Sequence, residues 1–144
     1  MIKEKFENIY RMFRMEFYKH LFSIVKEREG SLSAVELSSA EVIFLLGSPT
    51  IKEFADFLEI SQPNATYKIK MLVEKGYIKK IPSEADGREY SLSVTDKFLK
   101  YYSANNTYGD FIWDKMKDSL TEDEILKIDG VLNLLSEKVF SDKK

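Results

Sequence analysis

The sequence predicts a mainly α-helical domain with one small β-hairpin, an α+β fold. Apolar residues recur every three or four positions over most of the 144-residue chain, which is the period of an amphipathic helix. Residues 77–81 and 90–94 instead read as two short strands, and the segment between them contains Asp86-Gly87, which is turn chemistry. The length suits one domain, so we expect residues 1–144 to form a single unit.

The first helix is predicted from Ile2 to about Glu29, because Phe6, Phe13 and Leu21 lie on one apolar stripe that Gly30 ends. A second helix is expected to begin at Ser38. Its hydroxyl and the Glu41 carboxylate have the spacing of a capping box, and Gly47-Ser48-Pro49 would end that helix.

Two further helices follow closely. Thr50 and Glu53 form another capping box before a helix of about two turns. Ser61 can cap the next helix, with Pro63 tolerated in its first turn and Gly76 just past its end.

After the hairpin, Thr95 is expected to cap a longer helix with a disturbance near Gly109, and Thr121 with Glu124 opens the last helix. The apolar residues expected on the longer helix are Phe98, Leu99, Tyr102, Phe111 and Met116.

Composition excludes several classes of function. The chain has 22 Lys and Arg against 24 Asp and Glu, a net charge of −2, so its overall charge does not indicate a nucleic-acid partner. It has no cysteine and one histidine, which excludes a disulfide framework, a thiol redox switch and a Cys- or His-rich metal site. With no Gly-rich phosphate loop either, we expect no enzyme, cofactor or metal.

No apolar run approaches the roughly 20 residues of a membrane helix. The start of the chain also lacks the apolar stretch of a secretory signal, so we expect a cytoplasmic protein with no membrane partner.

Two short helices joined by a tight turn and followed by a hairpin are the layout of a winged helix-turn-helix. On the second of these helices Ala65, Ile69 and Leu72 share an apolar face, and the opposite side is polar. Residues 60–81 hold five lysines against one glutamate, a local charge of +4 that suits phosphate binding. A lysine run of this kind is also compatible with an ordinary solvated face.

The whole chain resembles the MarR family of bacterial transcription regulators. SQPNATYKIKMLVEKGYIKK resembles that family's recognition helix, closing turn and first wing strand, and ADGREYSLSVT resembles its wing signature. In the family an Asp-x-Arg in the wing sends an arginine into the minor groove, and here Asp86 and Arg88 occupy those positions. Gly87 departs from the pattern, because the family usually has a second basic residue there.

The resemblance implies a two-fold homodimer that acts as a repressor. Its helices at 1–30 and 110–144 would dimerise, and its region 38–100 would read a pseudo-palindromic double-stranded DNA operator. The recognition helix would lie in the major groove and the wing in the minor groove. The candidate DNA-binding residues are Ser61, Gln62, Pro63, Asn64, Thr66, Tyr67, Lys68, Lys70, Lys79, Asp86 and Arg88, of which Gln62, Asn64, Thr66 and Tyr67 are the candidates for reading bases.

The last helix carries an apolar seam of coiled-coil type, whose partner is either the first helix of its own chain or a second copy. The candidate dimer residues are Ile2, Phe6, Ile125, Ile128, Leu132, Leu135 and Val139. Residues 110–144 have a net charge of −3, from six basic and nine acidic side chains, opposite in sign to residues 60–81.

Members of the family often release DNA when a small aromatic or anionic effector binds. The residues that could line such a pocket here are Phe13, Phe17, His20 and Leu45, although an aromatic stripe at helical spacing is more often core. The alternative function is a winged-helix module that binds protein and not DNA.

Overall fold

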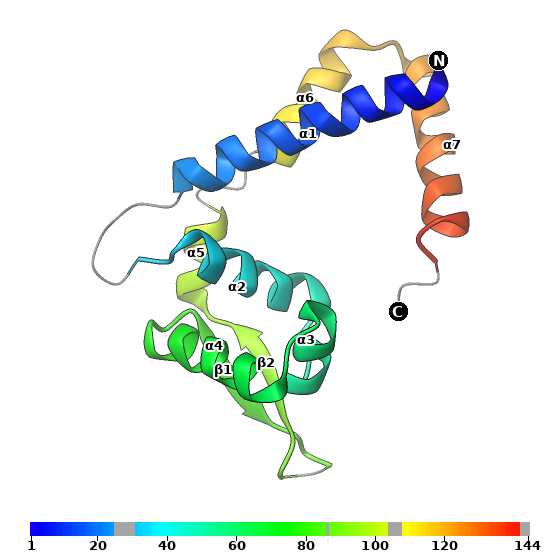
Figure 1. Cartoon of the computed structure of the whole chain (residues 1–144). Coiled ribbons are helices and arrows are strands. Elements are labelled where there is room, and N and C mark those ends of the chain that lie inside the picture. Colours follow the sequence, from blue (N-terminus) through cyan, green and yellow to red (C-terminus); the bar gives the residue numbers. More distant parts are fainter. Residues whose placement is uncertain (25–30, 86, 104–107, 142–144) are drawn as a thin grey trace. The chain divides into compact units, whose positions relative to one another are not determined.

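The computed structural model describes residues 1–24, 31–85, 87–103 and 108–141, with helices and one antiparallel hairpin in the predicted order (Figure 1). The chain divides into two compact units, Met1–Asn105 and Asn106–Lys144. The elements of the first unit are α1 (Ile2–Ile24), α2 (Ala34–Leu46), α3 (Ile51–Leu58), α4 (Gln62–Glu74), β1 (Ile78–Pro82), β2 (Tyr90–Val94) and α5 (Asp96–Ser103). Those of the second are α6 (Tyr108–Ser119) and α7 (Glu122–Lys138).

The start of α2 differs from the prediction. Its N-cap is Ser33, whose hydroxyl accepts a hydrogen bond from the Glu36 amide at 3.2 Å, and Glu36 Oε2 accepts from the Ser33 amide at 2.7 Å. Ser38 lies inside the helix and donates to the Ala34 carbonyl. Both serines are followed by glutamate at the capping spacing, so local chemistry does not choose between them. The earlier start brings Leu37 into the core as part of the helix, and this burial favours it.

The predicted starts of α3 and α4 are confirmed. Thr50 Oγ1 accepts from the Glu53 amide at 3.1 Å, and Glu53 Oε2 accepts from the Thr50 amide at 2.8 Å. Ser61 Oγ accepts from the Asn64 amide at 3.3 Å. After α4, Gly76 has φ +79°, a left-handed conformation that glycine adopts without strain, so the chain turns sharply into β1.

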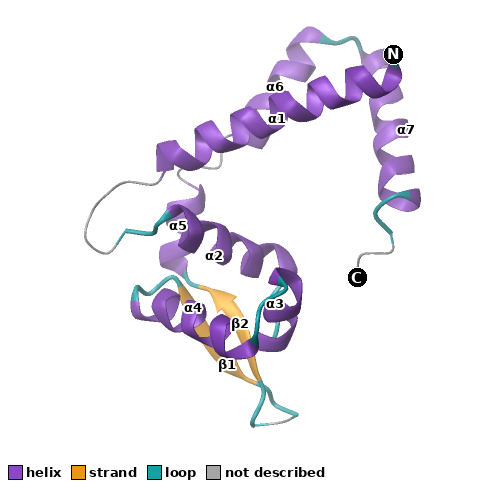
Figure 2. Cartoon of the chain, viewed as in Figure 1, coloured by secondary structure: helices purple, strands orange, loops and turns teal. Residues whose placement is uncertain are grey.

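The hairpin runs in the predicted place, with β1 starting one residue later than expected (Figure 2). Its register pairs Ile78 with Val94 and Pro82 with Tyr90. The Leu92 amide donates to the Pro49 carbonyl at 2.7 Å, so β2 is also fastened to the turn before α3. This bond fixes the position of the wing against the helix-turn-helix.

After Thr95, where one longer helix is predicted, the structure describes two helices, α5 and α6. Phe98 of α5 is fully buried, and its amide donates to Thr95 Oγ1. Residues 104–107, near the disturbance expected at Gly109, lie outside the described residues, as do the side chains of Tyr102 and Phe111. The capping box of Thr121 and Glu124 at the start of α7 is confirmed. The predicted end of the first helix, between 25 and 30, also lies outside the described residues.

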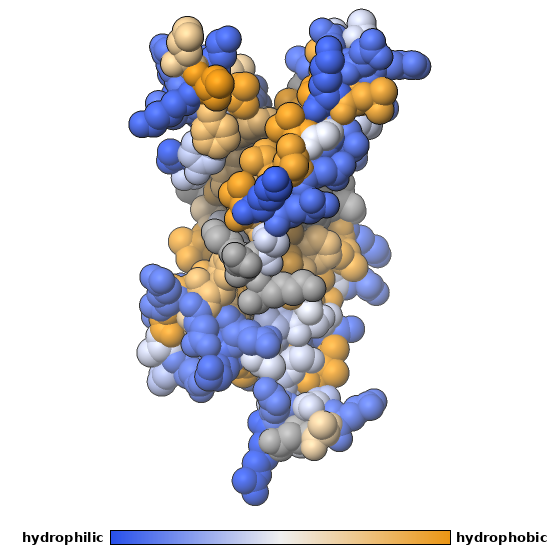
Figure 3. Space-filling view, turned by 90° about the vertical axis from the view of Figure 1, so that its right-hand side faces the viewer, coloured by the Kyte–Doolittle hydropathy of each residue, from blue (hydrophilic) through white to orange (hydrophobic). Residues whose placement is uncertain are grey.

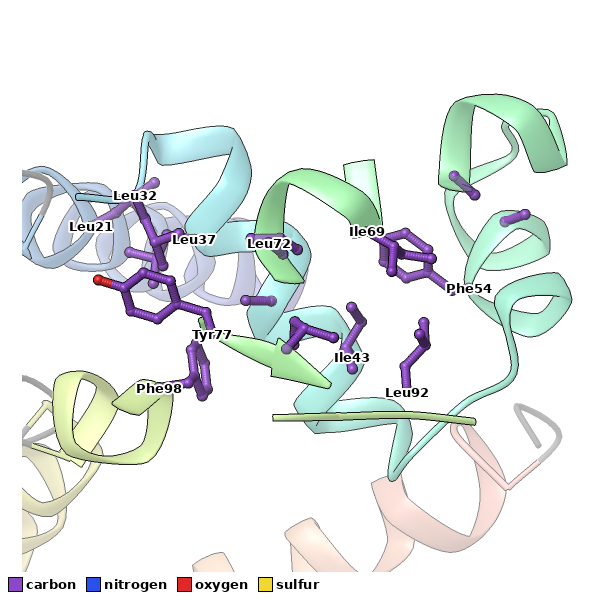
Figure 4. Packing of buried hydrophobic residues seen from close by; sticks show 14 residues of the cluster. Leu21, Leu32, Leu37, Ile43, Phe54, Ile69, Leu72, Tyr77, Leu92 and Phe98 are labelled. Carbon is purple, nitrogen blue, oxygen red and sulfur yellow. The ribbon is translucent and has the colours of Figure 1, made fainter. Parts of the chain in front are cut away.

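The core of the first unit is built from α2, α3, α4, the hairpin and α5 (Figure 4). The predicted inner face of α4 is confirmed, since Ala65, Ile69 and Leu72 are fully buried. In contrast, α7 has no buried residue, and the one buried hydrophobic residue described on α1 is Leu21. No helix in the described ranges is both long and apolar enough to cross a bilayer.

Candidate nucleic-acid interface

Helix α4 presents most of its candidate residues to solvent. Its inner face anchors it in the core, so the polar side chains on the opposite side project outward. Lys68 is half-buried. The exposed candidates on α4 and at its cap are Ser61, Gln62, Pro63, Asn64, Thr66, Tyr67 and Lys70.

A groove brings α4 and the wing together. It is a cavity of about 470 Å³ lined by Gln62 and Thr66 from α4, and by Arg88, Glu89 and Tyr90 from the wing. The remaining lining comes from the start of α3. Amide, hydroxyl and guanidinium groups therefore share one open surface, which is the mixture of donors and acceptors that reads base edges and binds phosphate.

The groove contains residues that sequence reasoning did not select. Lys52, in the first turn of α3, lines it and makes an exposed ion pair with Asp56 at 3.0 Å. The sequence could have indicated Tyr90 as a groove residue, because the period of a strand places it on the same face as buried Leu92. Lys52 had no such signal, since its nearness to Gln62 depends on how α3 packs against α4.

The same period separates two lysines of β1. Lys80 pairs with Leu92 and lies on the face of the hairpin that carries Tyr90. Lys79, a predicted DNA-binding residue, pairs with Ser93 and lies on the opposite face, where it is exposed. The two lysines therefore lie on opposite faces of the wing.

Comparison with known proteins agrees with this geometry. The sequence model of the MarR family matches residues 41–90, which run from α2 to the start of β2. The matched segment contains the helix-turn-helix and the first part of the wing. The resemblance found from the sequence is thereby confirmed. Curated protein sequences include no match to the chain.

Several solved structures share the fold of this chain. FabT of Streptococcus pneumoniae, solved in complex with DNA, is 21% identical over 95% of this chain and 96% of its own, with a TM-score of 0.68. Tm0710 of Thermotoga maritima is 22% identical over 97% and 99%, with a TM-score of 0.67. MepR of S. aureus, bound to ethidium bromide, is 15% identical over 91% and 94%, with a TM-score of 0.62.

The wing carries an exposed arginine at position 88. Arg88 is exposed and lines the groove, whereas Asp86 lies outside the described residues. The backbone does not require a glycine at position 87. The φ of Gly87 does not lie in the left-handed range that favours glycine, and a Cβ added there would meet no atom within 4 Å. A larger side chain could therefore be accommodated at position 87.

One lysine of the positive segment faces away from this surface. Lys75, which caps the C-terminal end of α4, places Nζ 2.8 Å from Glu36 Oε2 and 2.9 Å from the Ser31 carbonyl oxygen. Burial raises the pKa of Glu36, but the hydrogen bonds from Lys75 and Ser33 outweigh it, so the pKa lies below its ordinary value of 4.5. Lys75 therefore does not contribute to the positive charge of the exposed face of α4.

A second hollow lies on the other side of α4. It is a cavity of about 320 Å³ between the first turns of α2 and the side chains of Tyr67, Lys68 and Met71. The candidate residues of α4 therefore flank two depressions. No group of three or more His, Cys, Asp or Glu side chains that could hold a metal ion occurs among the residues that the structure describes.

Proposed function

We propose that this protein is a DNA-binding transcription regulator that reads double-stranded DNA with α4 in the major groove and the wing in the minor groove. The observation that carries the proposal is the shared surface of Gln62, Thr66 and Arg88. Its donors and acceptors come from an exposed helix and an adjacent hairpin, the two elements with which winged helices contact DNA. FabT, solved with DNA bound, supports the proposal through its fold.

Each candidate group has a role that suits its chemistry. Gln62 and Asn64 can make paired hydrogen bonds to an adenine edge, and Thr66 and Tyr67 can reach bases or phosphates. The lysines at 68, 70 and 79 neutralise phosphates. The guanidinium of Arg88 suits the strong negative potential of a narrow minor groove, with Asp86 as its proposed orienting partner.

We also propose that two copies associate through α1 and α7. Both helices expose large apolar side chains, including Phe6 at 62% and Leu132 at 54% exposure. Figure 3 shows hydrophobic residues interspersed with hydrophilic ones on the surface of the face that it presents. A monomer rarely leaves such stripes in water. The proposed interface residues are Ile2, Phe6, Ile125, Ile128, Leu132, Leu135 and Val139, and two-fold symmetry would match a pseudo-palindromic operator.

The association is checked by sedimentation equilibrium. Wild type is expected to sediment as a dimer, and Leu132→Lys as a monomer, because a charge in the seam has no partner and must be desolvated. Glu137→Lys, also exposed on α7, is the control and should stay dimeric. A monomeric wild type would contradict the proposal.

The DNA-binding function is tested by selection from genomic fragments, in which the purified protein retains its preferred duplexes. We expect a common sequence among the retained fragments. The affinity for it should fall steeply with salt, with a log–log slope of several units, because each neutralised phosphate releases counterions. No retained fragment, with a protein partner captured instead, would favour the alternative of a protein-binding winged helix.

We further propose that the regulator represses and that a small aromatic or anionic effector releases it. MepR, solved with ethidium bromide, supports an effector through its fold. In the structure Phe13, Phe17 and Leu45 are exposed, and the side chain of His20 lies outside the described residues. The exposed aromatic face of α1 remains our proposed place for the effector, since aromatic rings bind flat apolar ligands.

A further inference from the structure

The C-terminal end of α4 is held by side chains from two distant parts of the chain. Lys75 donates to Glu36 Oε2 and to the Ser31 carbonyl, both at the start of α2. From the start of α5, Lys97 Nζ donates to the Lys75 carbonyl at 2.7 Å and lies 4.5 Å from the ring centroid of Tyr77. The end of α4 is thus tied on both sides.

A second set of bonds fixes the turn that follows α4. Thr95 Oγ1 donates to the Gly76 carbonyl at 2.6 Å, and the Thr95 amide donates to the Tyr77 carbonyl at 3.0 Å. The carbonyls of three successive residues, 75, 76 and 77, therefore all accept hydrogen bonds from α5 or the residue before it. Carbonyls at and beyond the end of a helix have no partner within it, so these bonds hold the turn after α4 to the start of α5.

The Lys75 contact is also linked to the start of α2. The same Glu36 oxygen that accepts from Lys75 accepts from the Ser33 amide, so one carboxylate both caps α2 and holds α4. The side chains of Lys75 and Glu36 are 25% and 20% exposed, which distinguishes them from the solvated pair of Lys70 and Glu74. Removing one partner of a partly buried ion pair leaves the other charge without compensation, so the loss of either side chain should disturb this contact.

We propose that Lys75 is a positioning residue for DNA binding: held by Glu36, it sets the tilt of α4 so that the N-terminal half of that helix meets the bases. The inference rests on the proposed function. A helix of 13 residues is about 20 Å long, so a tilt of about 10° at Lys75 moves Gln62 by about 3 Å. Such a shift exceeds the tolerance of a hydrogen bond to a base edge.

A positioning lysine and a phosphate-binding lysine differ in a measurable way. Losing a phosphate contact weakens binding to all sequences and lowers the salt slope by about 1. Misplacing the helix weakens binding to the selected duplex and leaves the non-specific affinity and the salt slope unchanged. The ratio of specific to non-specific affinity therefore separates the two roles.

The experiment compares Lys75→Met with Lys70→Met, its matched control on the exposed side of α4. The affinity of each folded variant is measured for a duplex retained in the genomic selection and for a scrambled duplex, over a range of salt. For Lys75→Met we expect the specificity ratio to fall at least about tenfold, the cost of one lost base contact, at constant salt slope. Lys70→Met should lower both affinities together.

Two further variants distinguish a loss of helix positioning from a loss of folding. Glu36→Gln leaves an oxygen for the Ser33 amide but removes the charge that holds Lys75, and it should reproduce the fall in specificity. Lys75→Arg keeps a cation that reaches Glu36 and should restore the ratio. Far-ultraviolet circular dichroism and thermal unfolding establish that each variant is folded at the measuring temperature.

Two results overturn the inference. One is an unchanged specificity ratio in folded Lys75→Met or Glu36→Gln, and the other is a Lys75→Met variant that behaves like Lys70→Met, with both affinities and the salt slope reduced. Failure of the proposed function gives a different signature, because wild type would then retain no DNA at all.

Discussion

Replacing Phe54 by alanine is expected to lower the free energy of unfolding by about 3–5 kcal/mol, because the ring is removed from a packed interior that cannot fully collapse. Phe54 lies on α3 with no exposed surface, in the same cluster as Ile43, Ile69 and Leu92. A typical domain has only about 5–15 kcal/mol of net stability, so a loss of this size shifts the urea midpoint markedly.

Phe57 provides the matched control for this substitution. It lies on the same helix, three residues along, and is 59% exposed. Phe57→Ala should therefore change stability by less than about 1 kcal/mol. Both variants are unfolded in urea at one protein concentration, since association also stabilises the folded state. Equal midpoints for the two variants would mean that Phe54 does not lie in the core.

Replacing Arg88 by alanine is expected to weaken binding to the selected DNA by about 10- to 100-fold, the range for losing one specific arginine contact. Arg88 lines the groove beside Gln62 and Thr66, so its guanidinium and the amide of Gln62 would engage neighbouring parts of one site. The effect should exceed that of removing a single lysine, because a guanidinium makes several directed hydrogen bonds.

The control for this prediction is Arg11→Ala. Arg11 is an exposed arginine on α1 that donates to Asn8 within its own helix, so its loss changes the net charge equally without touching α4 or the wing. Affinities are measured by fluorescence anisotropy at constant salt. If Arg88→Ala and Arg11→Ala bind the selected DNA with equal affinity, Arg88 of the wing does not contact DNA.

Features that depend on neighbours in the sequence were predictable. The caps at Thr50, Ser61 and Thr121 each require a partner only three residues away, and all three form. The buried face of α4 follows from helical periodicity, and the hairpin follows from β-prone residues on either side of a turn. The outward side chains of α4 could be selected as candidate DNA contacts for the same reason.

The prediction for α2 failed where local signals were equal. Ser33 and Ser38 are both followed three residues later by glutamate, so the sequence offers two capping boxes of the same form. The helix begins at the first, because Leu37 and Ala40 are then buried against the rest of the core. Hydrophobic burial, which depends on distant parts of the chain, therefore determines that Ser33 and not Ser38 caps α2.

By itself, then, the sequence determined the class of fold, the caps and the outward face of α4, since these arise from periodicity and contacts over three or four residues. Only the tertiary structure decided which lysines can face DNA. Lys75 counts as a positive charge in the sequence, yet it is held by Glu36, 39 residues away, and Lys52 reaches the groove from another helix. Such pairings depend on how helices pack, which no local pattern records.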